Sequence, residues 1–188
     1  MTASRHPAHL AQLNVATLRY PLDDPRVAPF VEMLDPVNAA ADGTPGFVWR
    51  LVEDGEGDAT GLRPLGDDVI VNLSVWESQE ALWDFAYRSG HLEVMRKRRD
   101  WFHRHVEAHL VLWWVPAGHV PTVGEAVERL ADLRAHGPSP RAFTFASSYT
   151  AAEAAAEAEA ASEAEAATAA VTVAEAAEHA PDGDSATV

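Results

Sequence analysis

The 188-residue chain contains no cysteine, and lysine occurs only once, as Lys97. Without cysteine there are no disulfides, thiolate metal sites or cysteine nucleophiles. No apolar run approaches the ~20 residues that span a bilayer, and the first residues lack the apolar core of a secretion signal. The sequence therefore predicts a cytoplasmic protein with no membrane partner. Its frequent arginine and alanine are typical of a GC-rich bacterial genome.

Basic residues are scarce, and the formal net charge is −15. Nine of the acidic residues lie in 151–188, which has no lysine or arginine, so residues 1–150 carry only −6. A nucleic-acid-binding domain would be basic, and we expect no such partner. Residues 150–188 are interpreted as an acidic Ala/Glu tail, disordered or partly helical, because its like charges repel and it has few large apolar side chains to bury. Residues 1–149 form the predicted domain.

Hydrophobic periodicity predicts the elements of that domain. Strands are expected at residues 10–18, 46–52, 68–76 and 109–115, and helices at 24–34 and 78–105. Asp24 is the expected N-cap of the first helix, and Pro36 is expected to bend or end it. The order strand, helix, strand, strand, helix, strand predicts an α+β, ferredoxin-like βαββαβ sheet. An extra helix from a Thr122–Glu125 capping box to Gly137, and a short strand at 141–146, complete the domain.

The third strand has two different faces, because successive side chains alternate. One face is aliphatic, with Val69, Val71, Leu73 and Val75, and we expect it to pack on the two helices of the βαββαβ unit. The other face is mixed and carries Ile70, Asn72, Ser74 and Trp76, with Gln12 and Asn14 beside it on the first strand. Such a face suits either the interface of a dimeric barrel or the wall of a ligand cavity.

Five segments carry a family resemblance: "GFVWRL", "NLSVWES", "YRSGH", "RRDWF" and "LWWVPAGHVPT". Together they resemble an uncharacterised bacterial domain family of the dimeric α/β-barrel superfamily, over roughly residues 8–147. The superfamily includes the antibiotic-biosynthesis monooxygenases. The resemblance implies a ferredoxin-like sheet that forms a dimeric α/β barrel, and hence a homodimer.

Monooxygenases of this superfamily oxidise small phenols and anthrones with O₂ and without a cofactor. They use an Asn and a Trp four residues apart on a central strand, followed by a helical Arg, and the resemblance places these roles on Asn72, Trp76 and Arg96. The Tyr of those enzymes corresponds to Leu82, and Tyr87 is the expected substitute. His91 is the expected proton carrier, because imidazole titrates near neutral pH.

A haem-degrading branch of the superfamily offers an alternative. It uses an Asn on the first strand and a Trp on the third, which correspond to Asn14 and Trp76. Its iron-ligating His corresponds to Ala86, and His91 lies five residues later. The alternative function is therefore a haem- or small-ligand-binding barrel without catalysis. A purely structural dimer is a third reading.

Further ligand contacts are expected from Asn14, Arg50, Tyr87, Arg99 and Trp114, with Arg50 either a cavity cation or a surface residue. The basic run 96–99 covers all sides of a helix, so at least one of its members faces inward. Arg96 and Arg99 are the expected inward members, whereas Lys97 is expected to be exposed. The imidazoles of His103, His105 and His109 lack a supporting carboxylate motif, and no metal site is predicted.

Overall fold

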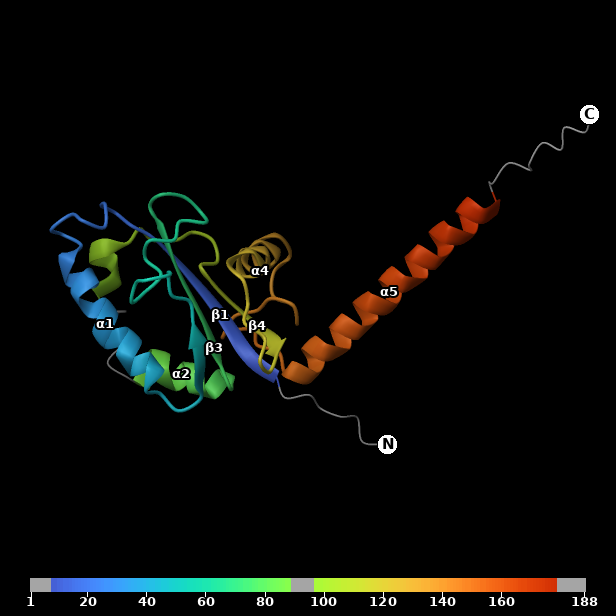
Figure 1. The fold of residues 1–188 in the computed structure, drawn as a ribbon, viewed down its shortest axis with the longest axis horizontal. Helices are drawn as coiled ribbons and strands as arrows, with labels where there is room; N and C mark the ends of the chain where they lie inside the picture. The colour runs from blue at the N-terminus through green and yellow to red at the C-terminus, as the bar shows by residue number, and fades with distance from the viewer. Residues whose placement is uncertain (1–7, 89–96, 179–188) are drawn as a thin grey trace, which may run out of the picture.

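The structure is a computed structural model that describes residues 8–88 and 97–178. Four strands form its sheet: β1 (Ala8–Thr17), β2 (Phe47–Arg50), β3 (Val69–Trp76) and β4 (Leu110–Pro116). Helices α1 (Ala28–Asp42) and α2 (Gln79–Arg88) lie on one side of the sheet, and α4 (Val123–His136) lies on the other (Figure 1). The final helix, α5 (Ala151–Glu178), projects away from these layers.

The strands follow the order β2-β3-β1-β4, and every neighbouring pair is antiparallel. β1 therefore lies between β3 and β4, the two strands that are joined by α2 and the segment after it. In the same way, β3 lies between β1 and β2, the two strands that are joined by α1. This is the split βαβ arrangement, so the predicted ferredoxin-like α+β fold with an extra C-terminal helix is confirmed. The register sets Asn14 opposite Asn72, and Gln12 opposite Ser74.

The aliphatic face of the sheet packs on α4, not on α1 and α2 as expected. Ala126, Leu130 and Leu133 of α4 join one buried cluster with the alternate side chains of β1, β3 and β4. Leucines near β2 and in the loop that follows it, Leu51, Leu62 and Leu65, extend this cover. The prediction was wrong because α4, which looked like an appendage, supplies the apolar surface that this face requires.

The mixed face lies beneath α1 and α2, and its apolar contacts gather at its two ends. At one end, Leu10, Trp76 and Leu82 form a cluster with side chains from α1 and α2. At the other end, Ile70 packs with Phe30 and Phe102. The polar positions of β1 and β3 lie between the two clusters. The helices thus rest on the ends of this face and leave its middle uncovered by apolar side chains.

Several expected boundaries shift. α1 begins after Val27, while Asp24 accepts hydrogen bonds from the backbone and side chain of Arg26 in the preceding turn. Pro36 lies inside α1, which continues to Asp42. The helical segment expected to reach His105 ends at residue 101. Residues 141–146 form no strand, but pair with β4 through a single bridge between Phe143 and Leu112.

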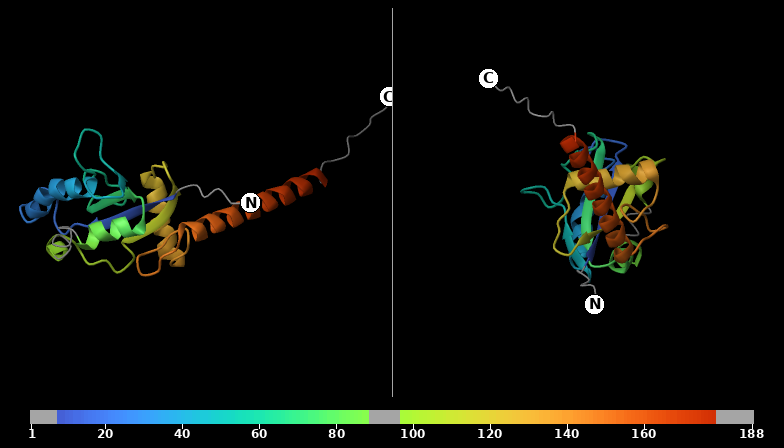
Figure 2. Two further views of the ribbon diagram at one scale, coloured as in Figure 1. Left: turned by 90° about the horizontal axis from the view of Figure 1, so that it is seen from below. Right: turned by 90° about the vertical axis from the view of Figure 1, so that its right-hand side faces the viewer.

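A threonine N-cap begins each helix of the C-terminal part, and the one at α5 is a complete capping box. Thr122 Oγ1 accepts from the Glu125 backbone N–H at 3.1 Å, as predicted. The same device begins α5, where Thr150 Oγ1 accepts from Glu153 N–H, and Glu153 Oε2 accepts from Thr150 N–H. α5 runs for 28 residues and extends far beyond the domain (Figure 2), so most of the segment expected to be disordered or partly helical is one continuous helix. Within the described residues, no helix has the length and hydropathy to cross a bilayer.

Candidate functional site

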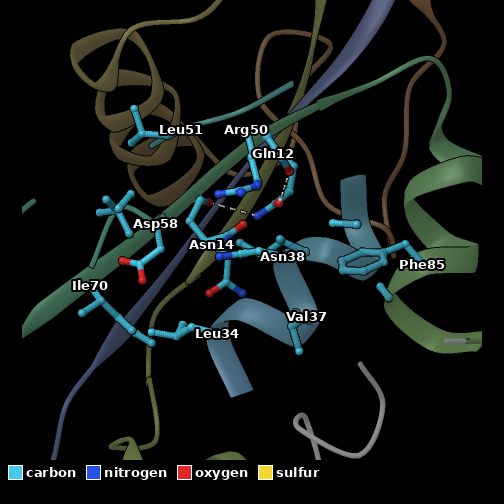
Figure 3. A pocket seen from close by; sticks show the side chains of 18 of the residues that line it. Gln12, Asn14, Leu34, Val37, Asn38, Arg50, Leu51, Asp58, Ile70 and Phe85 are labelled. Carbon is cyan, nitrogen blue, oxygen red and sulfur yellow. Dashed lines mark hydrogen bonds between the residues drawn. The ribbon is translucent and has the colours of Figure 1, made fainter. Parts of the chain in front are cut away.

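A cavity of about 330 Å³ occupies the space between the mixed face and the helices α1 and α2. Such a volume lies at the lower end of the ~300–1,000 Å³ of small-molecule pockets. Its walls come from β1, β2, β3, α1, α2 and the loop after β2, and Figure 3 shows side chains from these elements around it. The hollow forms where the two apolar clusters of this face leave polar strand positions uncovered.

Aromatic rings close one end of the cavity. Trp76 is 1% exposed, and its ring stacks on Phe85 with centroids 5.2 Å apart. Phe47 meets the other side of Trp76 edge-on, also at 5.2 Å. These positions follow from the register, since Phe47 and Trp76 are cross-strand partners, while Phe85 comes from α2. This end offers a flat apolar wall to a ligand.

A hydrogen-bond chain connects Trp76 to the middle of the sheet. The Trp76 indole N–H donates to Ser74 Oγ at 2.9 Å, and Ser74 Oγ donates to Gln12 Oε1 at 2.9 Å. Gln12 Nε2 then donates to the Asn72 backbone carbonyl at 3.4 Å (Figure 3). Every buried polar atom of this chain has a partner, as burial requires. The indole N–H of Trp76 is therefore engaged within the protein.

Three amide side chains line the cavity without such partners. Asn14 and Asn72 stand opposite one another on β1 and β3, and Asn38 comes from α1 on the opposite wall (Figure 3). Among the described residues, none of these three amides has a side-chain hydrogen bond. Each amide offers two donors and one acceptor. The middle of the cavity thus presents polar groups that a ligand can use.

Arg50 also lines the cavity, and its charge is already balanced. Its Nε donates to Asp42 Oδ1 at 2.9 Å, and its Nη1 donates to the Gly57 carbonyl at 2.9 Å. The guanidinium therefore ties β2 to the end of α1 and to the loop after β2. This arrangement favours a structural role for Arg50 over direct capture of an anion.

The cavity border near the start of β4 is basic. Arg98 and His109 both line the cavity, with Arg98 Nη1 3.5 Å from His109 Nε2. The His105 ring stacks on His109 at 5.1 Å between centroids. Burial, followed by the positive charge of Arg98, lowers the pKa of both imidazoles below 6.5. Both effects disfavour the protonated forms of the two rings.

The sequence-predicted residues fall into three groups. Those that line the cavity are Asn14, Arg50, Asn72, Trp76 and Tyr87. His91 and Arg96 lie outside the described residues, and their roles stay predictions. Arg99 is exposed and does not line the cavity, contrary to the expectation that it is partly buried there. Trp114 is half-buried, but its indole N–H donates to the Tyr149 carbonyl at 2.7 Å, away from the cavity lining.

Sequence reasoning placed Gln12 and Ser74 on the mixed face without assigning them to the site, and it missed five further polar side chains that line the cavity: Asn38, Asp58, Thr60, Arg98 and His109. A signal existed for Gln12, which shares its strand face with Asn14. Assigning Arg98 to the cavity would have required knowing which side of the helical segment faces inward, and a run of four basic residues does not define that side. Lys97 is exposed, as expected.

Of the three histidines near β4, two lie together and the third is separate. His105 and His109 stack, whereas His103 is exposed. In the part of the chain that the structure describes, no three histidine or carboxylate side chains gather in a group that could hold a metal ion.

Comparison with solved structures finds distant likenesses. The cofactor-independent oxygenase SnoaB from Streptomyces nogalater is 17% identical, over 60% of this chain and 95% of its own, with a TM-score of 0.40. The ActVA-Orf6 monooxygenase of Streptomyces coelicolor, solved with nanaomycin D, is 12% identical, over 62% and 95%, with a TM-score of 0.37. A protein of unknown function from Nitrosomonas europaea, NE2512, is 11% identical, over 62% and 98%, with a TM-score of 0.39. Similarities of this size transfer no residue role or reaction to the present chain.

No curated protein matches the chain. A family model does match, and it covers residues 9–160, which include all of the sheet except Ala8, the helices α1, α2 and α4, and the first turns of α5. This extent agrees with the uncharacterised family that the sequence motifs resemble. The chain therefore belongs to the family described as domain of unknown function DUF3291.

Proposed function

We propose that the protein binds a small, partly aromatic molecule in the cavity and oxidises it with O₂ in the manner of a cofactor-independent monooxygenase. The observation that carries this proposal is the cavity itself, with the Trp76–Phe85 stack at one end and the unpartnered amides of Asn14 and Asn72 in its middle. Binding sites for small molecules combine an apolar wall with a few placed polar groups in this way.

The proposed binding mode follows from the two kinds of wall. An aromatic ring system lies against the Trp76–Phe85 stack, where offset or edge contacts stabilise it. Its phenol or carbonyl oxygens receive hydrogen bonds from Asn14 and Asn72. Because the Trp76 N–H donates to Ser74, Trp76 acts here as a wall and the amides act as the donors.

The proposed reaction balances without an external reductant. A ring methylene is oxidised to a carbonyl, one oxygen atom of O₂ enters the product, and the other leaves as water with the two methylene hydrogens. The substrate supplies all four electrons that O₂ accepts. Proton removal from the methylene creates an anion, and amide N–H groups directed at its oxygen stabilise that charge. His91 and Arg96 remain the proposed proton carrier and anion-stabilising residue.

Oxygen uptake with anthrone as the probe substrate tests this proposal. We expect saturable O₂ consumption with one quinone formed for each O₂, and a loss of about 10²-fold in Asn72→Ala, the size expected for an oxyanion donor. Lys97→Ala is the matched control, because its side chain is exposed. Equal rates in wild type and Asn72→Ala would contradict the assignment of Asn72.

A small-ligand-binding protein without catalysis is the second candidate. The specific observation in its favour is the closed Trp76–Ser74–Gln12 chain, which removes the indole N–H from any reaction. Haem is one candidate ligand. The position that corresponds to the iron-ligating His of the haem-degrading branch is Ala86, which lines the cavity. Absorption spectroscopy after incubation with haemin tests the haem form, since a shifted Soret band in stoichiometric amount would favour it over the oxygenase.

Assembly as a homodimer is part of the same proposal, but the sheet faces do not supply its interface. The mixed face lies under α1 and α2, and the aliphatic face is sealed by α4. A dimer would therefore use other surfaces. Light scattering tests it, because a homodimer has twice the 20.3 kDa mass of the chain.

A further inference from the structure

Three basic side chains gather where the cavity meets the start of β4. We call Arg98, His105 and His109 the Arg98 cluster. Arg98 lies in the helical segment 97–101, and the two histidines lie in the segment that leads into β4. Arg98 and His109 line the cavity, and His105 stacks behind His109.

The charge of Arg98 is not balanced within the described chain. It is half-buried, and no described carboxylate lies within ion-pair distance of it. The nearby Arg134, in contrast, donates to the Ala108 carbonyl at 2.9 Å and lies 3.5 Å from Glu107 Oε2. An unpaired cation that is partly removed from water is unfavourable, so a bound anion at this place would restore its lost interactions.

The histidines give the same place further capacity for an anion. Among the described residues, the buried His105 Nε2 has no hydrogen-bond partner, whereas His109 Nε2 accepts from Arg98 Nη1 at 3.5 Å. The charged and titratable groups around them are Arg98, Arg134 on α4 and His103, and the Glu107 backbone makes a hydrogen bond with His109 that favours the protonated ring. Except for that backbone contact, which raises the pKa of His109, these groups oppose protonation of the rings. A bound anion would reverse this balance and favour the imidazolium forms.

We propose that Arg98, with His109 beside it, forms an anion-binding subsite for a ligand whose apolar part occupies the cavity. The ligand class is an aromatic or other apolar small molecule that carries a carboxylate, sulfonate or phosphate group. This inference rests on ligand binding in the cavity, as the proposed function does, but it does not require the oxidation chemistry.

The neighbouring residue Arg99 provides a matched control. It has the same side chain and charge, and it is exposed outside the cavity. Its backbone carbonyl accepts from Arg19 Nη1 at 3.0 Å, and a side-chain substitution leaves that carbonyl in place. Arg98→Gln and Arg99→Gln therefore remove the same formal charge from adjacent positions, and only Arg98→Gln removes it from the cavity border.

Two fluorescent probes with the same ring system test the subsite in the full-length protein. 8-Anilinonaphthalene-1-sulfonate carries one anionic group, and N-phenyl-1-naphthylamine lacks it. We expect both probes to bind the wild type and to compete with each other. In Arg98→Gln, the affinity for the sulfonate should fall about tenfold or more, as for the loss of a charge-assisted hydrogen bond. The neutral probe should change by less than about twofold, and Arg98→Lys should recover part of the sulfonate affinity.

A pH series and two competitors sharpen the test. Binding of the sulfonate to the wild type should tighten as the pH falls below about 6.5, because the bound anion favours protonation of His105 and His109, whereas binding of the neutral probe should not change. Benzoate and phenyl phosphate compete against the sulfonate, and the one that displaces it at the lower concentration identifies the preferred anion.

Distinct results would overturn the two proposals. Equal loss of sulfonate affinity in Arg98→Gln and Arg99→Gln, or no loss in either, would overturn the subsite while the neutral probe still reports the cavity. Failure of the neutral probe to bind the wild type would instead overturn ligand binding in the cavity. Circular dichroism of each variant establishes that the fold is retained before affinities are compared.

Discussion

The two faces of the sheet use the same strands and are both covered by helices, yet one is sealed and the other is hollow. On the sealed face, Leu73 and Trp113 are each 1% exposed, and α4 places Leu130 directly against the strands. The indole N–H of Trp113, a polar group within that cluster, donates to Glu125 Oε1 at 2.9 Å. On the hollow face, Asn72 is exposed to the cavity although it neighbours Leu73 in sequence.

The difference arises from where apolar side chains stand along the strands. The sealed face is apolar along its whole length, so a helix can lie on it without a gap. The hollow face is apolar only at its ends, around Trp76 and Ile70, with Gln12, Asn14 and Asn72 between them. Amides in the middle of a face forgo burial of apolar area, which would stabilise the fold. Their presence there is better explained by recognition of a ligand than by stability.

The largest difference between the two faces is expected from two single variants at adjacent positions, Leu73→Asn on the sealed face and Asn72→Leu on the hollow face. Leu73→Asn loses apolar packing on the sealed face and buries an amide without a partner, so it should lower the free energy of unfolding by about 4 kcal/mol or more. Asn72→Leu changes an exposed cavity position and should alter the same quantity by less than about 1 kcal/mol. Urea denaturation measures both, and similar losses in the two variants would remove the distinction between the faces.

The next largest effect is expected from shortening a buried side chain of α4, the helix that seals the aliphatic face. Leu130 is 1% exposed, and Leu130→Ala should cost about 2–4 kcal/mol in the free energy of unfolding through lost burial and a residual cavity. A matched change on the same helix is Glu128→Ala, since Glu128 is exposed and should change stability by less than about 0.5 kcal/mol. A cost below about 1 kcal/mol for Leu130→Ala would mean that α4 is not an integral part of the core.

Stability should also depend on pH through the border of the hollow face. The pKa values of His105 and His109 are lowered from 6.5 in the folded protein, by burial and then by Arg98, so the unfolded chain binds protons first as the pH falls. Their neutral forms should therefore contribute full stability above about pH 6.5 and progressively less below it. Denaturation midpoints at several pH values test this, and the double variant His105→Gln/His109→Gln should flatten the decline. A double variant with an unchanged pH profile would contradict the prediction.

The smallest effect is expected from the outer part of α5. Side chains of residues 162–169 are exposed, so these eight residues bury little apolar surface against the domain. Deletion of residues 162–188 should therefore leave the melting temperature within about 2 °C of the wild type. The deletion keeps the Thr150–Glu153 capping box and the Trp114–Tyr149 hydrogen bond. A loss of more than about 5 °C in a calorimetric scan would show that the distal helix contributes to folding.

Much of the architecture was predictable because alternation along a strand depends on sequence alone. Period two placed Asn72, Ser74 and Trp76 on one face, and the T-x-x-E pattern placed the start of α4. Which helices cover which face was not predictable in the same way, because α1 and α4 both present apolar side chains. The choice depends on how well each helix fits an aliphatic or a mixed surface, and that is a property of the assembled layers.

The site was predictable in part for the same reason. Asn14 and Asn72 were found because they share a strand face, whereas Asn38 was missed because a single amide on a helix gives no signal by itself. Arg98 was missed, and Arg99 was wrongly expected to face the cavity, since the inward members of a basic run depend on the helical phase. In α5, the high helix propensity of alanine and glutamate outweighed the repulsion between like charges.

The capped helix α5 also determines how the molecule moves through water. Twenty-eight helical residues extend about 42 Å at 1.5 Å per residue, which exceeds the diameter of a small domain. Its seven glutamates repel other copies over roughly one Debye length of about 8 Å at physiological salt. Friction therefore exceeds that of a sphere of 20.3 kDa, and a monomer should elute early from a sizing column. Elution volume alone would report too large a particle, so the number of chains in solution is better measured from scattering mass.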